Sequence, residues 1–317
     1  MSTNVGEVCD ETDDRSVRLP DIRSRPDHST VLFAHPRHFD VRYRINPYMG
    51  GRVDTDRARE QWRTLKDAYE RYATSVAVLD PAETWTALED GEYSDEDADA
   101  VSPAHLPDMV FCANHGLATP DGTGVVPATM ATDERAGEPT HFAAWCDDRG
   151  YEVLDAPDYR FEGTGDAIWH PEKRLLWGGY GVRTDQRVYD ELADRLDATV
   201  LTLELTDDHY YHLDVCFAPL DASTVLIQPD AFTADGLATI RTVFDRVLEA
   251  PLEESRNGLA CNCHCVDGET VLLGAGNPRT ERVLSEAGFD PVPIPTDEFQ
   301  KAGGSVCCLK LELGALT

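Results

Sequence analysis

The sequence has no long apolar segment. In its 317 residues no uninterrupted apolar run approaches the roughly 18 residues that a membrane-spanning helix requires. Residues 1–27 are polar and acidic and lack the apolar stretch of a signal peptide. We therefore expect a protein of the cytoplasm that has no membrane as a partner.

Positive charge is also scarce. Lysine occurs only four times, and 59 acidic residues against 28 basic ones give a net charge of −31. A field of this sign repels nucleic acids and anionic lipids, which excludes both as partners. The acids are spread along the whole chain, a pattern typical of a halophilic surface in a salt-rich cytosol, where screening weakens self-repulsion.

Disulfide pairs are not expected, although the chain has nine cysteines. Cytosolic thiols stay reduced, and an odd number leaves at least one unpaired. Cys261, Cys263 and Cys265 alternate, so a strand would place them on one face, whereas paired zinc ligands usually leave about two to four residues between them. We interpret them as small buried residues of a core strand and keep metal binding as the weaker alternative. No metal and no cofactor is expected elsewhere.

The chain divides into a short tail and one large domain. Residues 1–28 are charged, with few apolar side chains and no periodicity, and we expect a disordered acidic tail. Residues 29–317 are interpreted as a single α/β domain. Within it, residues 83–106 carry DGEYSDEDADA and are expected to form a solvated acidic loop.

A strand–strand–helix–strand pattern of about 45 to 60 residues recurs about five times along the domain. One unit has DMVFCAN and GTGVVPATM as strands, EPTHFAAWCDDRG as its helix and YEVLDA as its last strand. A strand in GGSVCCLKLEL completes the first unit, whose helix, DTDRAREQWRTLKDAYERYA, lies near the N-terminus. Five such units predict a five-bladed α/β propeller, a ring without exposed end faces. An open α/β sheet is the alternative, but no glycine-rich phosphate loop supports it.

Polar side chains recur near the start of the units, each beside an apolar strand. They are Asn46, Asn114, Glu162 with Asp166, His212 with Asp214, Asn262 and, in the closing strand, Cys308. Buried polar groups need partners, so a core would not select this set. In a ring these positions converge on the axis, which predicts one common site there.

These residue types suit the attack of a nucleophile on an amidine-type carbon. A partly ionised cysteine is the strongest nucleophile among side chains at neutral pH, and histidine carries protons in the same range. Paired carboxylates bind a planar guanidinium through two hydrogen bonds. Cysteine, histidine and several acids around one pocket therefore indicate covalent chemistry on such a group.

FEGTGD, HLD and GGSVCCLKLEL resemble signature blocks of the guanidino-group modifying enzymes, the pentein superfamily. That superfamily includes arginine deiminase, dimethylarginine dimethylaminohydrolase, agmatine deiminase and the amidinotransferases. The resemblance covers roughly residues 30–315 and implies the same five-bladed α/β propeller. Within the superfamily, HPRHFDVRYRINPYMGG, ANHGL and DERAGEP are most similar to arginine dihydrolases, which convert arginine into ornithine, carbon dioxide and two ammonia.

The resemblance implies the catalytic roles. Cys308 resembles the nucleophile, His212 the general acid and base, and Glu162 the carboxylate that orients the histidine. Cys307 would become the nucleophile if the register shifted by one. Neighbouring residues of a strand face opposite ways, so only one of the two thiols can face the pocket.

Four further residues resemble substrate-binding groups. Asp214 resembles an acid that binds the guanidinium, Arg135 the residue that holds the α-carboxylate, and Asn46 and Asn114 amides that contact the substrate. Asn114 stands where deiminases and dimethylargininases typically have aspartate. An amide has a donor and an acceptor but no charge, so it could hold a neutral ureido group as well as a guanidinium. The resemblance therefore implies two rounds of hydrolysis on arginine, and the alternative is that Asn114 only weakens the first step.

Other functions stay open. A dimethylarginine dimethylaminohydrolase or arginine deiminase would hydrolyse its substrate once, to citrulline, and an amidinotransferase would use an amine as acceptor in place of water. A non-catalytic binding module of the same fold is a further alternative. Each enzymatic function implies a small-molecule substrate, arginine or an N-substituted arginine, and each leaves a homo-oligomer open.

Overall fold

The computed structural model describes residues 8–9, 18–26, 28–72, 75–89 and 100–315. The strands of this described part form five sheets, four with three strands and one with four. In every sheet the first strand of the unit pairs antiparallel with the second, and the third returns parallel to the second after a helix. This is the predicted strand–strand–helix–strand unit, so the alternative of a single open sheet is wrong.

Each unit has, in this order, a first strand, a second strand, a helix and a third strand. The first contains β16 (Leu311–Leu313), β2 (Thr30–Ala34), α1 (Thr55–Tyr72) and β3 (Ser75–Leu79). The second contains β4 (Gly116–Ala118), β5 (Gly124–Pro127), α4 (Glu138–Asp148) and β6 (Glu152–Val153). The third contains β7 (Ala167–Trp169), β8 (Leu175–Tyr180), α5 (Val188–Leu196) and β9 (Thr199–Glu204). The fourth contains β10 (Phe217–Pro219), β11 (Thr224–Ile227), α6 (Ala234–Val243) and β12 (Arg246–Glu249). The fifth contains β13 (His264–Cys265), β14 (Thr270–Gly274), α8 (Pro278–Glu286) and β15 (Asp290–Ile294).

Helix α1 illustrates how the sequence produces a unit. Asp54 caps its start, since its Oδ1 accepts two backbone N–H groups of the first turn. Its buried side chains recur at helical spacing and include Trp62 and Tyr69. Both rings pack edge-on against Phe33 of β2, with centroid distances of 6.1 and 5.3 Å. The helix is thereby fixed on its own sheet.

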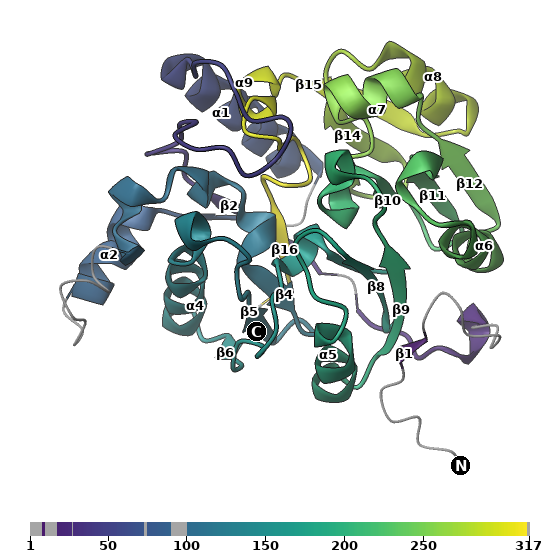
Figure 1. Ribbon diagram of the computed structural model, residues 1–317, viewed down its shortest axis with the longest axis horizontal. Coiled ribbons are helices and arrows are strands. Elements are labelled where there is room, and N and C mark those ends of the chain that lie inside the picture. Colours follow the sequence, from purple (N-terminus) through teal and green to yellow (C-terminus); the bar gives the residue numbers. More distant parts are fainter. Residues whose placement is uncertain (1–7, 10–17, 27, 73–74, 90–99, 316–317) are drawn as a thin grey trace.

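The closing strand joins the two ends of the domain. β16 pairs antiparallel with β2, with Leu311 opposite Leu32, so residues late in the chain complete the first unit as predicted. Figure 1 shows this yellow strand in the interior of the molecule, whereas α1, α4, α5 and α6 lie at the periphery. The segment just before β16 is consequently carried into the interior as well.

The predicted disorder of residues 1–28 is wrong for the described part of that tail. Val8 and Cys9 form β1, which pairs parallel with β9 and adds a fourth strand to the third sheet. Further along, Ser24 makes an isolated bridge with Lys173. A row of backbone N–H and C=O groups at a sheet edge accepts an extra strand of almost any composition, which explains why polarity alone misled the prediction.

The predicted acidic loop 83–106 contains regular structure. Helix α2 covers Pro81–Glu89, and a 3₁₀ turn covers Pro103–His105. Residues 90–99, which hold most of the acidic run, lie outside the described residues. Two short helices also fall between units, α7 (Leu252–Gly258) and α9 (Asp297–Gln300). None of the described helices has the length and apolar composition needed to cross a bilayer.

Several predicted strands begin later than expected, because the polar residues before them form turns. The 3₁₀ turns Cys112–His115, Gly163–Gly165 and Leu213–Val215 each end immediately, or one residue, before the first strand of a unit. Cys307 and Cys308 likewise lie in a turn that precedes β16. A strand would send successive side chains to opposite faces, whereas a turn lets consecutive polar groups gather at one end of the sheet.

We predict that alanine at Gly163 will strongly destabilise the protein. Gly163 has a φ of +57°, and a Cβ there would lie 2.6 Å from the backbone oxygen of Gly116 and 2.7 Å from that of Ala113. Gly150 has a φ of +83° but no atom within 4 Å of its Cβ position, so Gly150→Ala is the matched control. We expect Gly150→Ala to lower the free energy of unfolding by about 1 kcal/mol and Gly163→Ala by roughly 3 kcal/mol, measured by urea denaturation in molar KCl. Equal losses would contradict the close contact that Gly163, before the first strand of the third unit, makes with Ala113 and Gly116 of the second unit.

Candidate active site

The polar residues predicted at the starts of the units do meet. Each precedes the first strand of a unit, and each side chain is at most 2 % exposed: Asn114, Glu162, His212, Asp214, Asn262 and Cys308. Hydrogen bonds join groups of different units, as between His212 and Glu162. The structure therefore brings these six side chains together.

Cys308 lies between an acid and an amide. Its Sγ donates to Oδ2 of Asp214 at 3.0 Å and accepts from Nδ2 of Asn262 at 3.0 Å. Burial raises the pKa of the thiol well above its usual range, and the charge of Asp214 raises it further. The thiol therefore stays protonated near neutral pH unless a cation approaches the pair.

Asn262 organises the turn that carries this thiol. Its Oδ1 accepts the backbone N–H groups of Ser305, Cys307 and Cys308 at 3.1, 3.0 and 3.3 Å. Its Nδ2 also donates to the backbone oxygen of Asp214 at 3.1 Å. The sequence pattern included this residue, but no role was assigned to it. Its role is to fix the turn of Cys308 against the turn of Asp214.

Asp214 is a buried acid with a free acceptor. Burial raises its pKa to about 7, although the hydrogen bonds from Cys308 and Asn262 act in the opposite direction. Its Oδ1 has no hydrogen-bond partner within the described chain. A donor with positive charge would satisfy this oxygen and favour the ionised form of the acid.

His212 is oriented by Glu162. Its Nε2 lies 2.6 Å from Oε2 of Glu162, and its Nδ1 is buried without a hydrogen-bond partner among the residues described. Burial by itself raises the pKa of Glu162, but the hydrogen bond and charge of His212, together with Arg183, lower it below its usual range. The acid is therefore ionised and holds one ring nitrogen, which leaves the other available to a reactant.

Arg183 is a site residue that the sequence reasoning missed. Its Nη1 lies 3.2 and 2.9 Å from the two carboxylate oxygens of Glu162, and its Nη2 donates to the backbone oxygen of Ile45 at 2.8 Å. Its guanidinium also lies over the ring of Tyr211, 5.2 Å from the centroid. Arginine in a turn between a strand and a helix gives no local signal, because its partners are distant in the sequence.

Asn46 joins the loop after β2 to the turn that precedes Cys308. Its Nδ2 donates to the backbone oxygen of Ala302 at 3.0 Å, and its Oδ1 accepts the backbone N–H groups of Tyr48 and Met49. The hydroxyl of Tyr211 donates to the backbone oxygen of Gly303 at 2.8 Å. The predicted contact of Asn46 with a substrate stays a prediction, while its contacts with the protein fix the loop.

Asn114 has a defined amide orientation. Its Oδ1 accepts from Nη1 of Arg135 at 2.9 Å, and its Nδ2 donates to the backbone oxygen of Glu162 at 3.3 Å. A Cβ at Gly165 would lie 2.2 Å from Nδ2 and 3.4 Å from the ring of His212. The glycine therefore leaves the space that lets the amide nitrogen of Asn114 lie beside the histidine.

Asp108 is a second buried acid that the sequence did not reveal. It is 2 % exposed, its Oδ2 accepts from the hydroxyl of Tyr43 at 2.9 Å, and its Oδ1 has no partner in the described structure. Burial raises its pKa to about 7, and Arg135 acts against that rise. The sequence pattern predicted a strand for DMVFCAN and assigned no role to the one charged residue in it.

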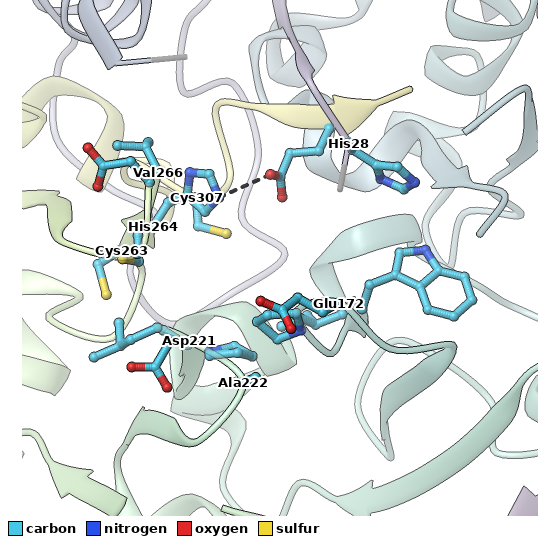
Figure 2. Close-up of a pocket in the computed structure, with 18 of the residues that line it drawn as sticks. His28, Glu172, Asp221, Ala222, Cys263, His264, Val266 and Cys307 are labelled. Carbon is cyan, nitrogen blue, oxygen red and sulfur yellow. Dashed lines mark ion pairs between the residues drawn. The ribbon is translucent and has the colours of Figure 1, made fainter. Parts of the chain in front are cut away.

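The two adjacent thiols face different surroundings. Cys307 lines a separate cavity of about 340 Å³, together with His264, Glu172 and Asp221, as Figure 2 shows. Burial raises the pKa of Cys307 to about 12. Only Cys308 bonds to Asp214, so the geometry favours Cys308 over its neighbour as the nucleophile.

The three alternating cysteines are not arranged as a metal site. Cys261 and Cys263 are buried before β13, whereas Cys265 lies within it and is half-buried. Burial raises the pKa of Cys261 and of Cys265 to about 12. Across the described residues, no three His, Cys, Asp or Glu side chains are grouped so that they could hold a metal ion.

Comparison with known sequences identifies one family model and related enzymes of two kinds. Residues 99–314 match the family model described as N,N dimethylarginine dimethylhydrolase, eukaryotic. The chain is 35% identical over 292 residues to the bifunctional arginine dihydrolase/ornithine cyclodeaminase ArgZ of Synechocystis sp., a match over 90% of this chain and 38% of ArgZ. It is 34% identical over 294 residues to the N(G),N(G)-dimethylarginine dimethylaminohydrolase of Mycobacterium tuberculosis, covering 92% of this chain and 88% of that protein. The chain thus spans less than two fifths of the length of ArgZ.

Solved structures share the fold. The N-terminal domain of ArgZ bound to its substrate superposes with a TM-score of 0.78 at 34% identity, covering 90% of this chain and 98% of that one. A dimethylarginine dimethylaminohydrolase adduct with S-methyl-L-thiocitrulline has a TM-score of 0.69 at 19% identity, covering 90% of this chain and 100% of that one. The chain therefore has the α/β fold of these pentein-type enzymes.

We predict that Asp214 suppresses the reactivity of Cys308. Since the charge of Asp214 raises the pKa of the thiol, Asp214→Asn will increase the rate of alkylation by iodoacetamide at pH 8.5 by at least about fivefold. The rate is measured by peptide mass spectrometry in a Cys307→Ala background, which leaves one thiol in the peptide. Cys146, whose pKa is raised by burial with no contribution from Asp214, serves as the internal control. An unchanged or slower rate at Cys308 would show that the acid does not control the thiol.

Proposed function

Because the chain belongs to the family of N,N dimethylarginine dimethylhydrolases, we propose that it hydrolyses the guanidino group of L-arginine twice, forming ornithine, carbon dioxide and two ammonia. The observation that carries this choice is the orientation of Asn114. With Oδ1 occupied by Arg135, the amide offers an N–H group to a reactant beside His212. An N–H group suits the carbonyl oxygen of a neutral ureido group, the product of a first hydrolysis.

The first round uses the charge of the substrate. A guanidinium bonded to the free oxygen of Asp214 favours transfer of the Cys308 proton to His212, because a cation lowers the pKa of a nearby thiol. The Sγ–C bond then forms at the guanidinium carbon, and His212 protonates the nitrogen that leaves as ammonia. His212 next removes a proton from water, which attacks the same carbon, and the C–S bond breaks to give citrulline and a free thiolate.

The second round repeats these steps on a neutral carbon. Asn114 donates to the ureido oxygen while Sγ of Cys308 attacks, and the negative charge that develops on this oxygen strengthens that hydrogen bond. Ammonia leaves with a proton from His212, and water then opens the thiocarbamate. The resulting carbamic acid separates into ornithine and carbon dioxide, which balances the reaction.

Two charged residues are proposed for the amino-acid end of the substrate. Arg135 keeps its predicted role in holding the α-carboxylate, although its Nε and Nη2 pair with Glu138. The unpartnered oxygen of Asp108 suits the α-ammonium group, and Arg183 lies nearby. Together they would select an α-amino acid over a simple guanidine.

We also propose that the five units form a ring about a pseudo-fivefold axis. In support, first strands of different units contact one another, β16 with β4 and β10 with β13. The site would then lie on that axis. A salt-rich cytoplasm and the absence of a nucleic-acid partner stay predictions from composition, and the oligomeric state stays open.

A single hydrolysis is the second candidate. The family model and the relative from Mycobacterium tuberculosis are both named for dimethylarginine hydrolysis, which releases one amine. An amidinotransferase would differ only in using an amine as acceptor. Product analysis separates all three.

The deciding experiment measures products. Purified protein is incubated with L-arginine in molar KCl, and citrulline, ornithine and ammonia are quantified. We expect one ornithine and two ammonia per arginine, no product from Cys308→Ser, and mainly citrulline from Asn114→Asp, whose carboxylate cannot donate to the ureido oxygen. Citrulline alone from the unmodified protein would identify a single-step enzyme. No turnover of arginine would direct the trials to N-methylated arginines and amine acceptors.

The pH dependence of kcat/KM should follow the ionisation of Asp214. Since burial raises the pKa of this acid to about 7, it becomes protonated below that pH and loses its hold on a guanidinium. We expect kcat/KM for arginine to fall about tenfold for each pH unit below roughly 7, because this constant reports the free enzyme. The profile is measured from pH 5 to 9 in molar KCl, with thermal unfolding at each pH as the control. A constant kcat/KM between pH 5 and 7 would exclude an ionised Asp214 from substrate binding.

A further inference from the structure

Glu138 has no place in the reaction described above, yet it is fully buried behind Asn114. It begins helix α4 with 0% exposure, and Arg135 is 3% exposed. His115, also at 0%, has its Nε2 3.4 Å from Oε2 of Glu138. Burying an ionised carboxylate costs free energy, because its charge is removed from water. The contacts of Glu138 must therefore offset that cost.

The acid holds the guanidinium of Arg135 in one orientation. Nε of Arg135 lies 3.0 and 3.1 Å from the two oxygens of Glu138, and Nη2 lies 2.6 Å from Oε2. Burial alone would raise the pKa of Glu138, but Arg135 and His115 lower it, so the acid is ionised. A planar guanidinium that pairs with a carboxylate through both Nε and Nη2 has little freedom to rotate.

The remaining nitrogen of that guanidinium, Nη1, fixes the orientation of the Asn114 amide. Arginine can only donate, so Nη1 of Arg135 at 2.9 Å requires an oxygen, and Oδ1 of Asn114 is that atom. Rotation of the amide by half a turn would place its NH₂ group against the arginine donor. It would also place Oδ1 against the backbone oxygen of Glu162. Both arrangements are repulsive, so the chain of contacts from Glu138 allows one amide orientation.

We propose that Glu138 is a positioning residue that confers specificity for the second hydrolysis, acting through Arg135 on Asn114. The inference rests on the proposed function, because only the ureido intermediate accepts the N–H group that this orientation presents. The guanidinium of the first round carries only donors and is held by Asp214. Loss of Glu138 therefore impairs the conversion of citrulline more than the conversion of arginine.

The test compares the two rounds in one set of variants. Glu138→Gln removes the charge and replaces one acceptor oxygen by a donor, Glu138→Asp keeps the charge, and Glu134→Gln is an exposed neighbouring control. For Glu138→Gln we expect kcat/KM with citrulline as substrate to fall by at least about tenfold, because losing one oriented donor altogether costs roughly 10²–10³ in kcat. We expect arginine consumption to change by less than about threefold and citrulline to accumulate. Glu138→Asp should restore part of the ornithine yield, and Glu134→Gln should match the unmodified protein.

Three outcomes would overturn the proposal. An unchanged ratio of ornithine to citrulline in Glu138→Gln means that the acid does not act on the second round. Equal losses in both rounds, with unfolding temperature preserved, mean that it acts on a step common to both, such as the grip on the α-carboxylate. Absence of ornithine from the unmodified protein, with either substrate, instead refutes the proposed function itself. If Glu138→Gln does not fold, the same ratio in Glu138→Asp decides.

Discussion

The structure depends on a single constraint, which is that a buried polar group must find a partner. Each unit carries at least one such group just before its first strand, and the partner lies on another unit. His212 of the fourth unit bonds Glu162 of the third, and Asn262 of the fifth bonds Cys308 of the first. The contacts that would perform the chemistry are therefore also contacts that join the units, and fold and site form one network.

Charge is distributed unevenly within this network. Glu162 is ionised because His212 and Arg183 bond it, whereas Asp214 has no basic side chain bonded to it among the described residues. The thiol of Cys308 and the acid beside it consequently compete for a proton. In the proposed reaction the guanidinium of arginine resolves this competition, so the substrate itself supplies the charge that activates its nucleophile.

Much of the architecture could be predicted from local pattern, because alternation and helical periodicity are local properties. The five units and the closing strand followed from that pattern, and the recurring polar residues located the site. Arg183, Asp108 and Glu138 were not found, since their partners are set by contacts between distant segments. The same limit explains β1, whose pairing depends on an edge of β9 that its own sequence does not reveal. The turns before the strands were not predicted, because the alternating pattern of a strand was extended through the polar residues that form those turns. The side chains of these residues gather at one end of the sheet.

The closing strand has a consequence for how the protein is made. β16 pairs with β2, so the first sheet cannot be completed until residues some 280 positions apart in the chain are both present. The thiol of Cys308 follows every other residue of the site in the sequence. During synthesis on the ribosome, four units can assemble while Cys308 is still untranslated. The proposed site is therefore complete only after those four units have been made.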